Sequence, residues 1–401
     1  MSAAKARNIE ELRRIARRRL PRIVRDYVEG GAEDHVTLRA NRAALQAIRL
    51  APRVLAGAAQ RSQRTRLFGR DHDSPFGIAP IGAAGLVWRE AEIALARAAH
   101  AFNVPFVLST HSFVPLARVA QHAGGAPWFQ LYLPNNRIDA GNLVALARDT
   151  GCEALVLTAD VPVGGNREYN DRNGFGIPLR LGARTVLDGL LHPRWLAGVY
   201  FRSDWRSAQA TNLSEWSTRR DAQGWSDFDW LRRAWSGKLL IKGILTAEDA
   251  LSALEHGADG IVVSNHGGRQ LDGASAAIEA LPPIAAAVAG RMAVLVDGGF
   301  RRGADIVKAL ALGADMVLVG RAALYGAAAG GEAGARRALH ILKTEVDRVL
   351  ALLGCASAAE LGPRHVRLAG RPLLGLDRGR PGDAREQRDL VADHTVEFLR
   401  R

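Results

Sequence analysis

Residues 261–273 read Ile-Val-Val-Ser-Asn-His-Gly-Gly-Arg-Gln-Leu-Asp-Gly, and the rest of the chain is organised around them. The β-branched run at 261–263 is typical of a short buried strand. Polar residues follow it at once, and the pair Gly267 and Gly268 then lets the backbone turn sharply and pass close to a flat or bulky group. The stretch therefore predicts a strand whose end is shaped to meet a ligand.

The side chains after this strand indicate the chemistry of the site. His266 is of the type whose ordinary pKa suits proton abstraction near neutral pH. Arg269 offers a planar fork that grips a carboxylate with two parallel hydrogen bonds, and Asp272 adds a carboxylate. We therefore expect a site that holds a carboxylic acid and removes a proton beside it. The alternative is a core histidine and a surface arginine on an ordinary turn, which the adjacent glycine pair makes less favourable.

The composition is that of a large globular domain. The chain has 401 residues, of which 48% are hydrophobic, so it can bury a sizeable core. Cys152 and Cys355 lie far apart beside apolar runs, which predicts neither a disulfide framework nor a metal site and favours a reducing compartment, the cytoplasm. The N-terminus lacks the apolar core of a signal peptide, and no run of about 18 apolar residues could span a membrane.

The formal net charge of +13 is compatible with nucleic acid, an anionic membrane surface or acidic substrates. Most of the charge is arginine scattered through helical stretches, with one cluster at 13–19. No zinc-finger, RNP or helix-turn-helix signature accompanies it, so we expect no nucleic-acid partner. A protein that binds nucleic acid or acts as a scaffold remains the non-enzymatic alternative.

Short apolar runs that end in small or polar residues recur along the chain and alternate with stretches of helical period. There are eight, at spacings of roughly 20–33 residues, which predicts a single (β/α)₈ barrel domain over 1–401. Helices are expected over 8–50 and also at 89–102, 138–150, 247–256 and 303–312. A long gap after the fourth run predicts an insertion at 161–238, and 366–401 is a polar tail. The runs are 77–82, 106–110, 128–132, 154–160, 239–243, 260–266, 293–299 and 316–320.

In such a barrel the carboxyl ends of the strands carry the chemistry, so the side chains that end these runs should converge on one mouth. Glycines after the last two runs, with Arg301 and Arg321, predict a phosphate site, although ordinary turn glycines are the alternative. No GxGxxG follows the first run and no Walker loop occurs, so a nicotinamide-binding Rossmann domain or an ATPase is not expected.

The run Ser-Asn-His-Gly-Gly-Arg-Gln-Leu-Asp at 264–272 resembles the active-site signature of the FMN-dependent 2-hydroxy-acid dehydrogenases and oxidases. The resemblance extends over about residues 8–365. It implies a (β/α)₈ barrel that binds FMN, oxidises an (S)-2-hydroxy acid to a 2-oxo acid and forms a homotetramer. Other FMN barrels, such as type 2 isopentenyl diphosphate isomerase or IMP-dehydrogenase-like enzymes, share the phosphate loops but lack the His-Gly-Gly-Arg pair and the second arginine.

The resemblance also implies roles for single residues at the cofactor. The backbone of 80–82 would pass beside the flavin, Lys242 would sit near its N1–O2 edge, and the other residues would bind the ring edge, the ribityl chain or the phosphate. The implied cofactor residues are Pro80, Ile81, Gly82, Ser109, Gln130, Thr158, Lys242, Ser264, Asp297, Gly298, Gly299, Arg301, Gly320 and Arg321.

At the substrate, the resemblance makes Arg167 and Arg269 a clamp for the carboxylate, with Tyr27 and Tyr132 beside it. His266 would take a proton while two electrons pass to the flavin, and Asp160 would orient His266 and stabilise its charged form. Both hydride transfer and a carbanion route are compatible with these residues.

Two departures from the family pattern bear on substrate and electron acceptor. His111 stands where glycolate oxidase has a pocket tryptophan, and Gly82 stands where many oxidases of the family have alanine. The stretch 187–195 resembles the corresponding part of (S)-mandelate dehydrogenase and, less closely, of membrane-bound L-lactate dehydrogenase. We therefore expect a bulky aromatic or medium-chain acid rather than glycolate, with a soluble oxidase that uses oxygen as the alternative.

The insertion is rich in tryptophan and arginine. Six of the eight tryptophans fall at 195–235, interleaved with leucines and arginines, and both aromatic rings and arginines are favoured at an anionic membrane interface. This predicts a peripheral protein on the cytoplasmic face of a membrane, passing electrons to a quinone or similar carrier. A lid that folds over the barrel mouth and buries its aromatics on the protein is the alternative. The tryptophans are Trp195, Trp205, Trp216, Trp225, Trp230 and Trp235.

Overall fold

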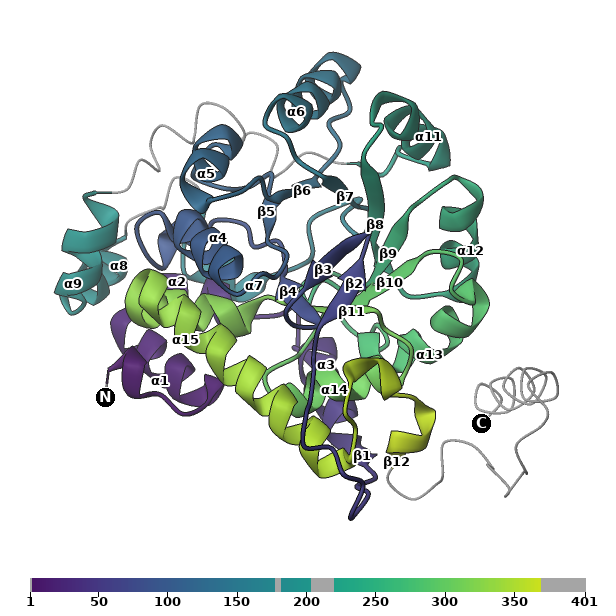
Figure 1. Cartoon of the computed structure of the whole chain (residues 1–401). Coiled ribbons are helices and arrows are strands. Elements are labelled where there is room, and N and C mark those ends of the chain that lie inside the picture. Colours follow the sequence, from purple (N-terminus) through teal and green to yellow (C-terminus); the bar gives the residue numbers. More distant parts are fainter. Residues whose placement is uncertain (1, 177–181, 203–219, 369–401) are drawn as a thin grey trace.

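The computed structural model describes residues 2–176, 182–202 and 220–368. Its centre is an eight-stranded parallel sheet in the order β4-β11-β10-β9-β8-β7-β6-β5, which a bridge between Ile78 and Phe106 closes into a barrel (Figure 1). Each predicted run overlaps one of its strands, so the (β/α)₈ prediction is confirmed. The strands are β4 (Phe76–Ile78), β5 (Val107–Ser109), β6 (Trp128–Leu131), β7 (Ala154–Thr158), β8 (Lys238–Ile244), β9 (Gly260–Val263), β10 (Ala293–Val296) and β11 (Met316–Val319).

The barrel is filled at one end and open at the other. Val156, Val262 and Leu295 point inward from their strands and belong to one buried cluster inside the barrel. The hairpin of β2 (Thr65–Leu67) and β3 (Arg70–His72) adds Leu67 to that cluster. Because this hairpin precedes β4 and lies at the amino ends of the strands, the cavity is left to the carboxyl ends.

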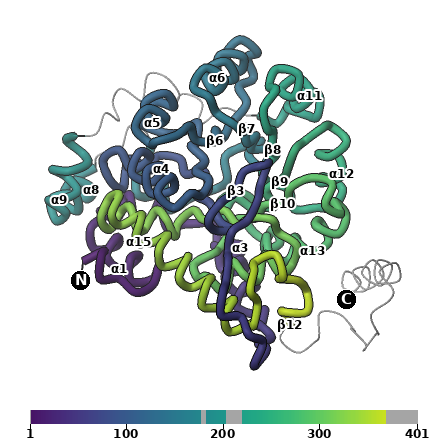
Figure 2. Tube along the Cα trace, in the orientation of Figure 1, coloured from purple at the N-terminus to yellow at the C-terminus, as the bar shows by residue number. Residues whose placement is uncertain are grey.

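Helices surround the barrel in chain order (Figure 2). The four helices expected between the runs are α4, α6, α12 and α14, with ends within two residues of the prediction. The last helix, α15, is bent at Gly331, which adopts a φ of +59°. The outer helices are α4 (Ala91–Ala101), α5 (Leu116–Ala123), α6 (Arg137–Asp149), α11 (Trp225–Ala234), α12 (Ala247–Glu255), α13 (Ala277–Val288), α14 (Gly303–Ala311) and α15 (Arg321–Leu353).

Helices were expected over 8–50, and the structure has α1 (Ile9–Arg19), α2 (Arg22–Glu29) and α3 (Val36–Ala47) there, whereas the last three residues form a strand. The Asn8 side chain caps α1 by accepting from the Glu11 amide at 2.9 Å. Strand β1 (Ile48–Leu50) pairs antiparallel with β12 (Val366–Leu368), so the first residues of the predicted tail are strand, and 369–401 lie outside the described residues. Short 3₁₀ helices occur at Ala3–Lys5, Ala84–Leu86, Ala358–Glu360 and Pro363–His365.

The predicted insertion contains α7 (Glu168–Arg172), α8 (Ala183–Leu190), α9 (Pro193–Trp195) and a π-helical turn, Leu196–Tyr200. Its last part is α11, which occupies the place of the ordinary crossover helix between β7 and β8. Helices α8 and α9 stand at the edge of the molecule next to α2 (Figure 1). Within the described ranges, no helix is both long and apolar enough to cross a membrane.

Candidate active site

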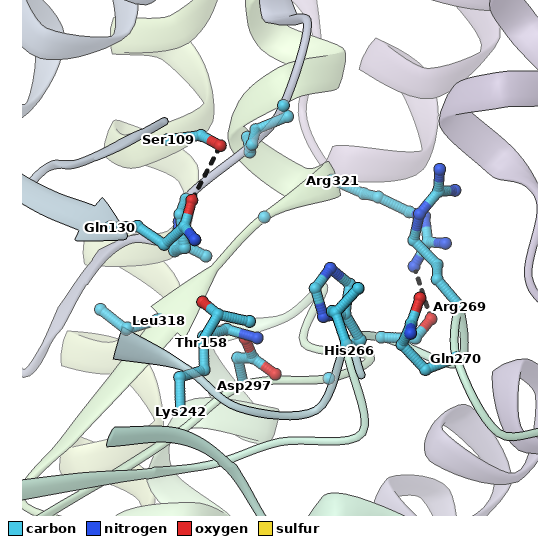
Figure 3. Close-up of a pocket in the computed structure, with 18 of the residues that line it drawn as sticks. Ser109, Gln130, Thr158, Lys242, His266, Arg269, Gln270, Asp297, Leu318 and Arg321 are labelled. Atoms are coloured by element: carbon cyan, nitrogen blue, oxygen red, sulfur yellow. Dashed lines mark hydrogen bonds and ion pairs between the residues drawn. The ribbon is translucent and has the colours of Figure 1, made fainter. Parts of the chain in front are cut away.

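A cavity opens at the carboxyl ends of the strands (Figure 3), and each barrel strand or the loop directly after it contributes residues to the wall. Helix α2 supplies Tyr27, and the insertion supplies Arg167 and Arg220. Of the residues expected in the site, all but Asp160, Ser264 and Asp272 line this cavity. Asp160 and Ser264 lie directly behind it, bonded to His266 and Lys242. The structure therefore brings the expected residues together.

His266 is held between an acid and a phenol. Its Nδ1 lies 2.9 Å from Asp160 Oδ1, and its Nε2 lies 3.4 Å from the Tyr132 hydroxyl. Its φ is +57°, an uncommon value for a residue other than glycine, and its amide donates to Ser264 Oγ at 3.0 Å. Because the carboxylate accepts the Nδ1 proton, Nε2 carries the lone pair on the side of Tyr132.

The surroundings keep this imidazole neutral and its partner charged. Burial lowers the pKa of His266 below its ordinary value, and the charge of Lys242 acts in the same direction, against Asp160. Burial alone would raise the pKa of Asp160, but His266 and Lys242 hold it below its usual value. Gly243 makes the approach of Asp160 possible, because a Cβ there would lie 2.5 Å from the Asp160 Cβ.

A buried lysine stands at the floor of the cavity. Lys242 Nζ donates to Ser264 Oγ at 2.8 Å and lies 3.3 Å from Asp297 Oδ2. Burial alone would lower the pKa of Lys242, but Asp297 and Asp160 outweigh it and raise the pKa. A fixed positive charge therefore faces whatever binds above it. Figure 3 shows Lys242, Asp297 and Thr158 gathered on one side of His266.

Several buried polar atoms around the floor have no hydrogen-bond partner among the described residues: Gln130 Nε2, Thr158 Oγ1 and Asp297 Oδ1. Ser109 Oγ donates to Gln130 Oε1 at 2.9 Å, which fixes the amide with its nitrogen available (Figure 3). Buried donors and acceptors normally have partners, so these three atoms mark the outline of a polar, flat ligand.

The part of the cavity wall that follows β10 and β11 is suited to an anion. Gly298 and Gly299 have φ values of +103° and +88°, so their backbone approaches the cavity in a conformation that L side chains rarely adopt. Arg301 lies beside them, and burial lowers its pKa. The Arg321 guanidinium donates to the carbonyls of Val28, Gly30 and Gly267, and burial lowers its pKa to about 9.

Two more arginines meet near His266. Arg269 Nη1 donates to the carbonyls of Tyr27 and Gly30 at 2.8 and 2.9 Å. Arg167 donates to the Arg269 carbonyl and to Gln270 Oε1. Burial, and then the charge of Arg269, lower the pKa of Arg167 to about 10. Two buried cations this close favour an anion between them.

Asp272, which the sequence placed with His266 at the strand end, does not line the cavity. Its carboxylate accepts from the amides of Val36 and Thr37 at 3.0 and 2.8 Å and so caps α3. The turn at 267–268 carries it away from the site. Gln270 was not predicted as a site residue, although it lies within the signature at 264–272. Its Nε2 donates to the carbonyls of Asp160 and Val163.

Fold and cavity together define a (β/α)₈ enzyme with room for a phosphate-bearing cofactor beside a histidine. The model of the FMN-dependent dehydrogenase family matches residues 16–368. The chain is 44% identical over 373 residues to (S)-mandelate dehydrogenase of Pseudomonas putida, which covers 90% of this chain and 94% of that one. It is 41% identical over 366 residues to L-lactate dehydrogenase of Chromohalobacter salexigens, and the match covers 88% of this chain and 93% of that one.

Solved structures that resemble this chain include proteins of the same kind. The monotopic membrane protein (S)-mandelate dehydrogenase matches with a TM-score of 0.86 at 42% identity, over 91% of this chain and 100% of that one. A mandelate oxidase mutant with (S)-mandelic acid matches with a TM-score of 0.78 at 38% identity, over 90% of this chain and 98% of that one. The chain belongs to the FMN-dependent dehydrogenase family: it is an FMN-dependent oxidoreductase of the class that includes mandelate and lactate dehydrogenases. The resemblance drawn from the signature is confirmed.

Proposed function

We propose that the protein oxidises an (S)-2-hydroxy acid, mandelate- or lactate-like, to the 2-oxo acid, with His266 as the base. The observation that carries this proposal is the environment of His266: its Nε2 faces the Tyr132 hydroxyl, Asp160 lies behind it at Nδ1, and Arg167 and Arg269 line the same cavity. A group that takes a proton and a group that holds a carboxylate are thus present in one cavity.

Arg167 and Arg269 would bind the substrate carboxylate, with Tyr27 and Tyr132 at its sides. The Arg269 side chain donates two hydrogen bonds to the described residues, and both come from Nη1. Its Nε and Nη2 therefore remain for a carboxylate. The Tyr27 hydroxyl donates to the Gly82 carbonyl at 3.0 Å, and its ring stacks on Phe175. These contacts fix the tyrosine before any substrate arrives, which lowers the cost of ordering on binding.

Proton removal falls to His266, whose neutral form is favoured by its buried site. Asp160 would orient the ring and stabilise the imidazolium that forms, and the Tyr132 hydroxyl would hold the substrate oxygen near Nε2. FMN, when bound, supplies the acceptor for the two electrons. Hydride transfer and a carbanion route both agree with this arrangement.

The cavity residues fit FMN. Gln130 and Thr158, with Ser109, would meet the edge of the ring, and the backbone of 80–82 would pass along it. Lys242 would place its charge at the N1–O2 edge. The ribityl chain would meet Ser264 and Asp297, and the phosphate would be held by Gly298, Gly299, Arg301, Gly320 and Arg321.

We also propose that the protein binds a membrane surface peripherally, on its cytoplasmic face, and passes its electrons to a quinone or similar carrier. Leucines and a phenylalanine of α8 and the following turn are exposed, among them Leu190 at 63%, Leu191 at 72% and Phe201 at 75%. Arg184, Arg194 and Arg202 of the same segment are exposed as well. Exposed apolar side chains together with arginines are suited to the interface of an anionic membrane. The similar (S)-mandelate dehydrogenase is described as a monotopic membrane protein.

The four tryptophans of the insertion that the structure describes do not contribute to this surface, contrary to expectation. Trp195 and Trp235 are each 3% exposed, and Trp225 and Trp230 pack against the core. Trp195 donates to the Leu86 carbonyl at 2.7 Å, so its ring fixes the insertion to the barrel. Trp205 and Trp216 lie outside the described residues. The case for a membrane contact therefore rests on the leucines of α8.

A soluble oxidase that uses oxygen is the second candidate, because a mandelate oxidase is among the structural neighbours. The two functions differ in the acceptor. We would supply (S)-mandelate and (S)-lactate to the purified yellow protein and measure the 2-oxo acid formed with a short-chain quinone or with oxygen. The proposal expects rapid turnover with quinone and slow turnover with oxygen. Rapid turnover with oxygen alone would favour the oxidase, and release of a flavin other than FMN on heating would contradict the cofactor site.

The family resemblance further leads us to propose a homotetramer, to be measured by light scattering. A monomer at micromolar concentration would contradict it.

A further inference from the structure

The side-chain amide of Gln270 makes four hydrogen bonds. Its Nε2 donates to the carbonyls of Asp160 and Val163 at 3.1 and 3.0 Å. Its Oε1 accepts from the Gly165 amide at 3.3 Å and from Arg167 Nη2 at 2.9 Å. A primary amide has two N–H donors and one oxygen with two lone pairs, so these contacts use its whole hydrogen-bonding capacity. The amide therefore has one orientation in which every bond is made.

These bonds join two loops of the cavity wall. Gln270 follows Arg269 in the loop after β9, whereas its partners lie between 160 and 167, in the loop after β7. Gly165 lets the loops touch, because a Cβ there would lie 2.3 Å from the Arg269 carbonyl oxygen and 2.8 Å from Gln270 Cα. Figure 3 shows Gln270 beside Arg269 at the cavity. Gln270 thus fixes the loop after β7 against the loop that carries His266 and Arg269.

The guanidinium of Arg167 is held by this amide. Within the described ranges, the Arg167 side chain makes two hydrogen bonds, from Nη2 to Gln270 Oε1 and from Nε to the Arg269 carbonyl at 3.2 Å. One edge of the guanidinium is therefore used by oxygen atoms of the protein, and Nη1 remains for a ligand. Arg269 is bonded through Nη1 instead, so the two arginines offer different edges to a carboxylate.

Holding Arg167 in place works against electrostatic repulsion. Burial, and then the charge of Arg269, lower the pKa of Arg167 to about 10. Without an acceptor to hold it, the Arg167 side chain would gain by turning away from Arg269 towards water. Gln270 Oε1 is a neutral acceptor, so it orients the guanidinium without cancelling its charge. The charge then remains for a bound anion.

We propose that Gln270 is a positioning residue for the carboxylate clamp: it holds Arg167 beside Arg269, with its charge uncancelled, before the substrate arrives. This inference rests on the proposed function and deepens it. Gln270 acts through Arg167. Because ordering a site in advance lowers the cost of binding, loss of Gln270 should weaken the affinity for a carboxylate and leave the affinity for an uncharged analogue intact.

The test compares acids with their neutral esters. Phenylglyoxylate and pyruvate, each beside its methyl ester, would be titrated into the oxidised holoenzyme and followed by the change in flavin absorbance. Gln270→Met keeps the length of the side chain and removes the four hydrogen bonds. It should weaken binding of the acids about tenfold and change that of the esters by less than about twofold. Gln63→Met is the control, because Gln63 Nε2 donates to the Lys343 carbonyl outside the cavity, and it should change neither.

A double-mutant cycle tests whether Gln270 acts through Arg167. Arg167→Met alone should weaken the acids, and adding Gln270→Met to it should cost no further affinity. In stopped-flow reduction by (S)-mandelate and (S)-lactate, Gln270→Met should raise the half-saturating concentration and leave the limiting rate within about threefold of the parent. Losses that multiply in the double variant, or equal losses for acid and ester, would overturn the proposal.

A second substitution covers the case in which Gln270→Met folds poorly. Gln270→Glu replaces the amide nitrogen by oxygen, preserves the volume and places a negative charge beside Arg167 Nη2. It should weaken the acids at least as much as Gln270→Met and spare the esters, because the new carboxylate competes with the ligand for the guanidinium. Unchanged affinity for the acids in this variant would also overturn the proposal.

The two proposals can fail separately. Reduction of the flavin by an (S)-2-hydroxy acid in the parent, together with unchanged acid binding in Gln270→Met, would remove Gln270 from the clamp and leave the proposed function intact. If no (S)-2-hydroxy acid reduces the flavin of the parent, the proposed function itself fails.

Discussion

Under the proposed function, His266 would draw its reactivity from its immediate neighbours: Asp160 fixes one ring nitrogen, Tyr132 faces the other, and burial keeps the ring neutral. We predict that His266→Gln retains FMN but slows flavin reduction by about 10²–10⁴, because a glutamine amide cannot take a proton. Stopped-flow absorbance with excess substrate measures the rate, and the visible spectrum of the oxidised variant serves as the control for cofactor content. A loss of only a few-fold would remove His266 from the role of base.

The pH profile tests the partnership with Asp160. If His266 is the base, as proposed, activity requires its neutral form. Because the pKa of His266 is lowered, kcat/KM should fall only below the ordinary histidine value of about 6.5 as the pH decreases. The Asp160 carboxylate raises this pKa, and Asp160→Asn removes that contribution. The acid limb should therefore move to still lower pH, while the plateau falls because the imidazolium loses its counter-charge. An acid limb that moves to higher pH would contradict this reading.

At the scale of the element, single side chains hold the loops that form the mouth. Glu92 on α4 accepts from the amides of Gly85 and Phe113, in the loops after β4 and β5. Burial raises the pKa of Glu92, against the backbone hydrogen bonds that lower it. Glu92→Ala should lower the free energy of unfolding by about 1–3 kcal/mol, because it leaves buried amides without an acceptor.

Denaturant unfolding measures this difference, and Glu92→Gln is the matched control. The glutamine keeps an uncharged acceptor at the same position, so its stability should stay close to that of the parent. Equal losses for the two variants would mean that packing, not hydrogen bonding, is what Glu92 contributes.

Elements and site residues differed in how far the sequence could predict them. Strands were predictable because β-branched runs end in glycine or polar residues, and the mouth followed because parallel strands share one carboxyl end. Asp272 was misplaced because the left-handed turn at 267–268 redirects the chain after His266. Arg220 was missed because its entry into the cavity depends on how the insertion folds back onto Leu133 and Pro162, and no periodic pattern encodes that path.

At the scale of the whole molecule, α8 is the element that would connect the barrel to a membrane. We predict that replacing Leu187, Leu190 and Leu191 together by serine weakens binding to vesicles of mixed zwitterionic and anionic lipid by at least about tenfold, because each leucine would bury apolar surface in the interface. Co-sedimentation measures the bound fraction. Leu352→Ser, an equally exposed leucine on α15, is the control. A triple variant that binds as the parent does would place the contact elsewhere or remove it.

We infer that the barrel, its FMN and His266 act together on one enantiomer of a 2-hydroxy acid. The test is an anaerobic titration of the purified holoenzyme with separate (S)- and (R)-enantiomers, following flavin absorbance and the 2-oxo acid formed. We expect the (S)-acid to bleach the flavin completely, with one 2-oxo acid formed per flavin, and the (R)-acid to leave the flavin oxidised. A flavin that stays oxidised with every (S)-2-hydroxy acid tried would overturn this inference.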